Sequence, residues 1–301
     1  MGDDPLNERQ EERPHEPSRE RAEERPIAAD PWSALRRFTA ARIALGRAGQ
    51  ALPLREVLAL RLAHARARDA VHEAFDDVAL HEQIRRHVRK HDGELQREVI
   101  GETPAAADEI AVHHLASRAV DRLEYLQRPD KGRSLDPASI ALLSSRPADE
   151  CDRDVAIVVA DGLSAIAVNS HAAALVAALL TRFAATSISV GAICLVRQGR
   201  VAIGDEIGQH LRARLALVIL GERPGLTAPD SLGAYLTYAP RPGLTDDSRN
   251  CISNIRPDGL PLSAAADRIS SLAREALRRQ ISGVALKDDT DDRAQLPSHS
   301  N

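Results

Sequence analysis

The chain has 301 residues, 43% of them hydrophobic and only 2% aromatic, so it can form one or two globular domains with an aliphatic core. Its formal net charge is −4, and no segment combines a basic stripe with stacking aromatic residues, which argues against a nucleic-acid-binding protein. Cys151, Cys194 and Cys251 form no Cys-x-x-Cys pair, which is typical of a reducing cytosol without structural zinc, and we expect neither a membrane span nor a secretory signal.

The N-terminal part is predicted to be helical after a charged extension. Residues 1–29 are rich in Glu, Arg and Pro, have little to bury, and are expected to be disordered. Asp30 and Pro31 are typical of an N-cap and a first helical residue, and they predict a helix that ends at Gly46. Its expected apolar stripe consists of Trp32, Leu35, Phe38, Ile43 and Leu45. A second helix is predicted over residues 53–74, with a buried face made of Leu54, Val57, Leu58, Leu62, Ala65 and Val71.

Residues 75–117 are polar and less regular, and we expect helix where Ile84, Val88, Leu95 and Val99 recur. His87 and His91 have a spacing that could hold zinc on a helix. The arginines around them would repel a cation, and no nearby Glu completes a metalloprotease motif, so a solvated basic face is preferred. His113 and His114 are interpreted as surface residues of a helix. No role is predicted for residues 85–112. Residues 125–133 are expected to form a turn-rich loop in which Asp130 caps the turn.

After Pro137 the pattern changes to alternating strands and helices. Strands are predicted at 155–160, 190–196, 215–220 and 234–239, and helices at 165–183, 203–211 and 263–281. Such alternation with short turns implies right-handed crossovers, so we predict an α/β fold with a Rossmann-like, mostly parallel sheet and helices on both faces. The chain is predicted to divide into a disordered extension (1–29), a helical N-terminal region (30–136), a Rossmann-like α/β domain that binds the ligand (137–286) and a disordered tail (287–301).

Three loop segments are predicted to meet at the carboxyl edge of this sheet: residues 198–201, 221–226 and 249–254. Pro224 ends the strand before it, and in open α/β sheets this edge is where ligands bind. A carboxylate at Glu222 would then lie over a ligand crevice. The alternative is that Glu222 only pairs with an arginine at the surface.

Several common catalytic motifs are absent from the chain. There is neither a Gly-x-Gly-x-x-Gly segment nor a phosphate-binding Gly-Lys-Ser/Thr loop, which disfavours a nicotinamide or ATP enzyme. Ile166 stands where a nucleophile elbow needs its second glycine, so Ser164 is interpreted as a helix N-cap. Taken alone, the second half is typical of a binding module.

Seven segments nevertheless form a specific pattern in chain order. They are residues 39–49 (TAARIALGRAG), 64–71 (HARARDAV), 125–135 (YLQRPDKGRSL), 161–169 (DGLSAIAVN), 199–208 (GRVAIGDEIG), 221–226 (GERPGL) and 251–255 (CISNI). With these segments, the chain resembles the small subunit, or light chain, of adenosylcobalamin-dependent ethanolamine ammonia-lyase over roughly residues 32–283.

The resemblance implies a lyase that converts ethanolamine to acetaldehyde and ammonia by a radical route. In this family a large subunit with a TIM barrel holds the substrate, so we expect no catalytic residue here and no metal ligand, but a hetero-oligomer of paired large and small chains. Carried over by motif, the cobalamin contacts fall at Val201, Glu222 and Cys251. The Asp-x-His-x-x-Gly motif that replaces the cofactor's own base is absent, so base-on adenosylcobalamin is expected.

Alternatives remain open for both the location and the function. The expected location is the cytoplasm, or a bacterial microcompartment within it, although residues 1–29 lack the apolar stripe of the family's targeting segments. The alternative function is a diverged, non-catalytic cobalamin-binding or scaffold subunit. A free-standing nucleotide enzyme is the third hypothesis.

Overall fold

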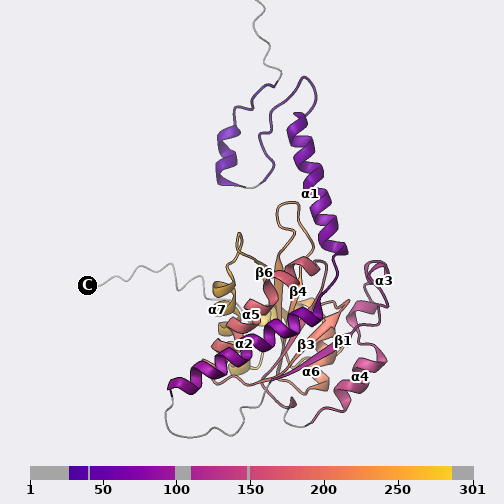
Figure 1. The fold of residues 1–301 in the computed structure, drawn as a ribbon, viewed down its shortest axis with the longest axis vertical. Coiled ribbons are helices and arrows are strands. Elements are labelled where there is room, and N and C mark those ends of the chain that lie inside the picture. The colour runs from indigo at the N-terminus through magenta and orange to yellow at the C-terminus, as the bar shows by residue number, and fades with distance from the viewer. Residues whose placement is uncertain (1–26, 40, 99–109, 148–149, 287–301) are drawn as a thin grey trace, which may run out of the picture. The chain divides into compact units, whose positions relative to one another are not determined.

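A computed structural model describes residues 27–39, 41–98, 110–147 and 150–286, with only the backbone described for residues 88–98 (Figure 1). The chain divides into two compact units, residues 1–59 and residues 60–301. The predicted disorder of residues 1–26 and 287–301 lies outside the described residues. Ala28, which was assigned to the disordered extension, forms an antiparallel bridge with Arg47.

In the first unit the predicted helix from Pro31 to Gly46 is wrong beyond its first turns. Only Ser33–Phe38 is helical, as a 3₁₀ segment, and Thr39 is extended. The N-cap is Trp32 rather than the predicted Asp30, although Asp30 Oδ1 accepts a hydrogen bond from the Trp32 N–H over 2.9 Å. Ala44 and Gly46 have φ of 49° and 76°, which a right-handed helix cannot contain.

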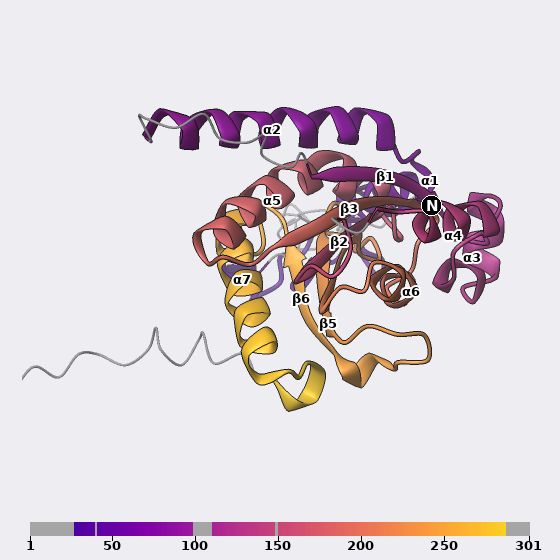
Figure 2. The ribbon, with the colours of Figure 1, turned by 90° about the horizontal axis from the view of Figure 1, so that it is seen from below.

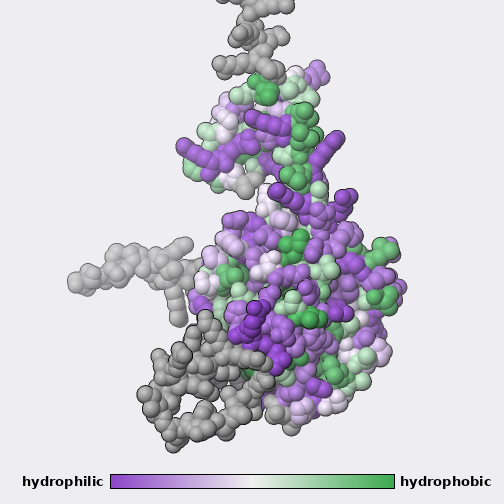
Figure 3. Space-filling view, in the orientation of Figure 1, coloured by the Kyte–Doolittle hydropathy of each residue, from purple (hydrophilic) through white to green (hydrophobic). Residues whose placement is uncertain are grey.

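Large apolar side chains of this unit lie at its surface. Trp32 and Phe38 are 68% and 73% exposed, and Figure 3 shows hydrophobic side chains across the surface of the unit. Helix α1 (Leu54–His72) lies within two residues of the predicted bounds at each end, but Leu54, Leu58 and Leu62 of its predicted buried face are at least half exposed. An apolar stripe predicts burial only where another element covers it, and no such cover holds these side chains within the described residues.

The second unit is built on a six-stranded mixed sheet. Its strands are β1 (Ala111–Ala116), β2 (Val155–Ala160), β3 (Val190–Arg197), β4 (Leu215–Gly221), β5 (Leu232–Tyr238) and β6 (Arg249–Ile255), in the spatial order β1-β3-β2-β4-β5-β6. The first four strands in that order are parallel, and β5 runs antiparallel to both β4 and β6. Five strands therefore share one direction, which confirms an α/β fold with a mostly parallel sheet.

Helices cover both faces of this sheet (Figure 2). One face packs against α2 (Asp77–Glu98), α5 (Ala165–Ala185) and α7 (Leu262–Arg279), and the other packs against α4 (Pro137–Ser144) and α6 (Ile203–His210). Alternate residues of β2 enter the two cores: Ile157 and Val159 face α5, while Val158 and Ala160 face α6. β2 and β4 are buried along their whole length, which explains why their sequences are apolar at every position instead of alternating between apolar and polar residues.

Two segments differ from the sequence-based predictions. Residues 111–116 were expected to be helical or irregular but form β1, which pairs with β3, and residues 249–254 were expected to be a loop but form most of β6. His113 is consequently 7% exposed and bonded to Glu150 over 2.6 Å, so its assignment to the surface is wrong. The side chain of His114 is 39% exposed and lies at the surface as predicted. The predicted boundary at residue 137 lies inside the sheet-bearing unit, because β1 precedes it.

Helix α5 is long and apolar enough to cross a membrane by length and composition alone, which contradicts the expectation that no segment approaches that length. It is the central helix of one core, however. Leu175, Val176 and Leu179 are fully buried in the cluster that includes β2 and β4. Its apolar composition is therefore explained by packing against the sheet.

Candidate functional site

A pocket of about 410 Å³ opens beside the carboxyl ends of β2 and β4. Its lining consists of Tyr125, Gly162, Leu163, Arg200, Val201, Leu220, Gly221, Glu222, Arg223 and Tyr235. Two of the three residues predicted to contact the cofactor, Val201 and Glu222, are among them. The third, Cys251, lies opposite Tyr235 in the pairing of β5 with β6.

The turn after β2 and the end of β4 approach each other backbone to backbone. The Leu163 N–H donates to the Gly221 carbonyl oxygen over 2.8 Å. A Cβ atom at Gly221 would lie 2.0 Å from the Ser164 carbonyl oxygen, and Gly162 has a φ of +57°. Only glycine fits here. Ser164 accepts from the Ala167 N–H over 3.3 Å, which confirms that it is the N-cap of α5.

Glu222 is held by neighbouring polar groups that leave part of its carboxylate accessible. Oε2 accepts hydrogen bonds from the Ser231 hydroxyl and, over 3.2 Å, from the Asn254 N–H. The alternative interpretation expected a surface arginine instead. Among the described residues both bonds go to Oε2, so Oε1 is the oxygen free to accept from a ligand.

Tyr235 connects Glu222 to Cys251. Burial raises the pKa of the Tyr235 phenol, and the neighbouring Cys251 thiol and Glu222 carboxylate raise it further. Burial also raises the pKa of Cys251, which a hydrogen bond with Tyr235 only partly offsets. Both groups therefore stay protonated at neutral pH. A protonated thiol is a poor nucleophile, so the raised pKa of Cys251 argues against a nucleophilic role.

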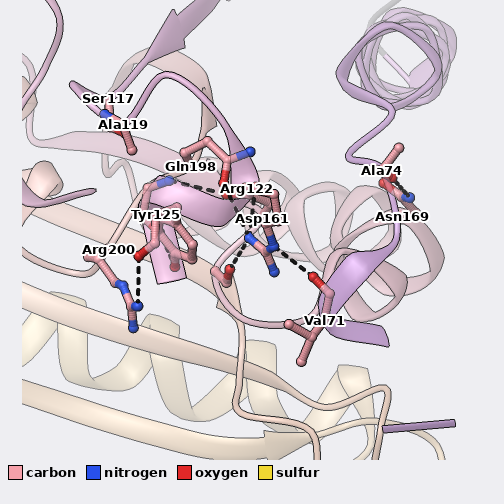
Figure 4. Close-up of polar contacts among 12 residues, drawn as sticks. Val71, Ala74, Ser117, Ala119, Arg122, Tyr125, Asp161, Asn169, Gln198 and Arg200 are labelled. Carbon is pink, nitrogen blue, oxygen red and sulfur yellow. Dashed lines mark hydrogen bonds and ion pairs between the residues drawn. The ribbon is translucent and has the colours of Figure 1, made fainter. Parts of the chain in front are cut away.

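Asp161 and Arg122 form a buried junction beside the lining residues Tyr125 and Gly162, and neither was predicted as a site residue (Figure 4). Arg122 donates to the Val71 carbonyl oxygen (2.6 Å), the Gly162 carbonyl oxygen (2.8 Å) and Asp161 Oδ2 (3.3 Å). Burial raises the pKa of Asp161 to about 6, although Arg122 and backbone N–H groups of the adjacent loops favour the carboxylate. At neutral pH the junction is therefore an ion pair. It ties α3 (Arg122–Gln127) to the turn after β2.

Tyr125 was expected to begin a loop, but it lies in α3 and is fully buried. Its hydroxyl donates to the Gly199 carbonyl oxygen over 3.1 Å. The guanidinium carbons of Arg122 and Arg200 lie 4.8 and 4.3 Å from its ring centroid, as cation–π contacts. Asp130 does not cap the turn with its side chain, since it pairs with Arg128. Figure 4 shows Tyr125 between the two arginines.

A larger cavity of about 610 Å³ lies beside β1, but its charged groups already satisfy one another. Asp77 accepts from Arg197 over 2.7 Å and from His114 over 2.8 Å, and His114 contacts His81 over 2.7 Å. Within the described residues no group of three or more His, Cys, Asp or Glu side chains could hold a metal ion. The pocket at Glu222 is therefore the stronger candidate for a ligand site.

Comparisons with known proteins agree with the segments quoted above. Residues 29–287 match the family model described as ethanolamine ammonia-lyase light chain (EutC). The chain is 52% identical over 263 residues to the ethanolamine ammonia-lyase small subunit of Ralstonia nicotianae, covering 87% of this chain and 90% of the relative. It is 51% identical over 267 residues to the small subunit of Azotobacter vinelandii (88% and 91% covered) and 50% identical over 261 residues to that of Pseudomonas fluorescens (86% and 88% covered).

Proposed function

Because the chain belongs to the ethanolamine ammonia-lyase light chain family, we propose that it is the small subunit of an adenosylcobalamin-dependent ethanolamine ammonia-lyase. In this proposal a large subunit with a TIM barrel binds ethanolamine, and the two chains together complete the cobalamin site. The products are acetaldehyde and ammonia, in the catabolism of ethanolamine. The proposed place of action is the cytoplasm.

The residues around the pocket fit the chemistry of a corrin ring. A corrin carries amide side chains that both donate and accept hydrogen bonds, and Glu222 Oε1 is an acceptor with its partner oxygen already fixed. Arg200 also lines the pocket, and it forms no ion pair among the described residues. This combination of a carboxylate oxygen without a partner and an arginine without a carboxylate partner in one pocket lining is the observation that carries the proposal.

Each predicted contact residue has a distinct part in the proposal. Glu222 accepts from corrin amides, Val201 offers an apolar surface and backbone polar groups, and the protonated Cys251 allows close approach beside Tyr235. Val201, Glu222 and Cys251 would hold base-on adenosylcobalamin, which would supply the radical chemistry when bound. This chain binds and orients the cofactor and excludes water from one side of it.

The test is reconstitution with an ethanolamine ammonia-lyase large subunit. We expect acetaldehyde release only when both chains and adenosylcobalamin are present. Glu222→Ala should raise the cobalamin concentration for half-saturation about 10- to 100-fold, because a charge-assisted hydrogen bond is lost. The matched control is Glu73→Ala, since Glu73 is exposed and does not line the pocket.

Other outcomes would favour the other hypotheses. A complex that binds cobalamin without turnover would identify a non-catalytic scaffold subunit. Cobalamin-independent turnover by this chain alone would contradict the proposal and favour a free-standing enzyme. An unchanged cofactor titration for Glu222→Ala would remove Glu222 from the site.

A further inference from the structure

Arg200 lines the pocket beside Val201 and is held in one orientation by α3 and the segment that follows it. The backbone N–H of Arg200 donates to the Gly132 carbonyl oxygen over 2.7 Å. The guanidinium group lies over the Tyr125 ring, and Nη2 contacts the Tyr125 carbonyl oxygen over 3.4 Å. The stem is packed so closely that a Cβ atom at Gly132 would lie 2.8 Å from Arg200 Cγ. The side chain is therefore fixed before any ligand arrives.

Within the described residues Arg200 lacks a carboxylate partner, whereas the neighbouring Arg122 has one. Arg122, on the same tyrosine, has Asp161 as its carboxylate partner at 3.3 Å. Arg200 forms no ion pair in the described part of the chain, and its Nε is buried without a hydrogen-bond acceptor there. Nε itself is shielded, so a ligand in the pocket would meet the rest of the guanidinium group. An arginine at a pocket wall without a carboxylate partner indicates a site for an anionic ligand.

The chemistry of that acceptor follows from the arginine itself. A guanidinium fork matches the oxygens of a phosphate or carboxylate and binds an anion more strongly than a neutral amide. Cobalamin is rich in neutral amides, but its nucleotide loop contains one phosphodiester. Resting on the function proposed above, we propose that Arg200 binds the phosphodiester of the cobalamin nucleotide loop.

The role assigned to Arg200 differs from that of Glu222. Glu222 accepts from neutral corrin amides, which every corrinoid has, whereas Arg200 reads the nucleotide loop and so distinguishes complete cobalamins from corrinoids that lack the loop. Arg200 is thus a specificity-determining residue for the cofactor. The two residues should respond differently to the same pair of ligands.

The experiment compares two ligands on the complex with the large subunit. Cyanocobalamin has the nucleotide loop, and dicyanocobinamide has the same corrin without the loop or its phosphate. Dissociation constants are measured by calorimetry for wild type, Arg200→Gln, Arg200→Lys and the matched charge control Arg241→Gln. Arg241 is exposed and does not line the pocket.

We expect Arg200→Gln to weaken cyanocobalamin binding about 10- to 100-fold and dicyanocobinamide binding less than about twofold. Arg200→Lys should show a smaller loss with the same selectivity, because it keeps the charge without the fork. Cyanocobalamin binding should also depend less steeply on salt in Arg200→Gln than in wild type, which decides the matter if cobinamide binds too weakly to measure. Arg241→Gln should match wild type.

Equal losses for both ligands, or an unchanged salt dependence, would overturn the proposal. Unchanged cyanocobalamin binding in Arg200→Gln would overturn it as well. If Arg200→Gln fails to assemble, Arg200→Lys carries the comparison of the two ligands, and equal losses for both ligands or unchanged cyanocobalamin binding would refute the proposal. A wild-type complex that binds neither ligand would instead refute the proposed function itself.

Discussion

The buried ion pair between Asp205 in α6 and Arg249 at the start of β6 tests how the two sides of the site are joined. Arg249 Nη1 and Nη2 donate to the two carboxylate oxygens over 2.6 and 2.7 Å, and the side chains are 2% and 3% exposed. Asp152 and Arg212 form a pair of similar geometry, with distances of 2.6 and 2.8 Å, but more than half of each side chain is exposed. The two pairs differ chiefly in burial.

Asp205→Asn should destabilise the protein far more than Asp152→Asn. The first change leaves the Arg249 guanidinium buried and turns an amide N–H toward one of its nitrogens, which costs about 3–5 kcal/mol for a buried pair. The second change removes an exposed pair and should cost less than about 1 kcal/mol. With a urea dependence of about 1–3 kcal/mol per M, the midpoint of urea unfolding should fall by roughly 1 M or more for Asp205→Asn only.

The assay is urea unfolding at pH 7 followed by far-ultraviolet circular dichroism. Asp205→Leu combined with Arg249→Met should recover part of the loss, because no buried charge remains. The recovery should be incomplete, since Arg249 also donates to the Thr237 hydroxyl and the Leu244 carbonyl oxygen over 3.1 Å each. Equal midpoints for Asp205→Asn and Asp152→Asn would refute the reasoning, as would a double variant no more stable than Asp205→Asn.

Two further predictions concern the end of β4 and the turn after β2. Gly221→Ala places a Cβ atom 2.0 Å from the Ser164 carbonyl oxygen and should lower the thermal midpoint sharply, whereas Gly225→Ala, whose nearest contact is 3.7 Å, should not; similar midpoints would contradict the close approach. Because burial raises the pKa of Asp161 from 3.8 to about 6, the folded protein holds a proton there that the unfolded chain has released. The Asp161 contribution to the free energy of unfolding should therefore fall by on the order of 3 kcal/mol as pH rises from 4 to 7. Asp161→Asn should abolish this part of the pH dependence, and an unchanged slope would exclude Asp161 as its source.

The central strands were predictable because a strand that is buried on both faces is a continuous run of apolar residues. β2 and β4 are apolar throughout, and both were placed within a residue of their observed ends. β1 and β6 were missed because they carry polar residues such as His113 and Arg249, whose partners lie on other elements. The helix predicted over residues 31–46 was wrong for a related reason. Its apolar residues recur with a helical period, but no other described element of the first unit packs against them.

The candidate site was only partly predictable for a related reason. Glu222 follows a buried strand directly, which marked it as a residue of the ligand edge, and the pocket contains it. Asp161 follows β2 in the same way and could have been found by the same rule. Arg122 and Tyr125 could not, because they reach Asp161 and Gly199 from 39 and 74 residues away in sequence.

The exposure of Trp32 decides which optical signal reports on which part of the molecule. It is the chain's single tryptophan, it belongs to the first unit, and 68% of it is open to water. The emission maximum of Trp32 in the native state should therefore be close to that of an indole in water. It should change little when the sheet-bearing unit unfolds. A blue shift on mixing with another chain would report cover over this unit alone.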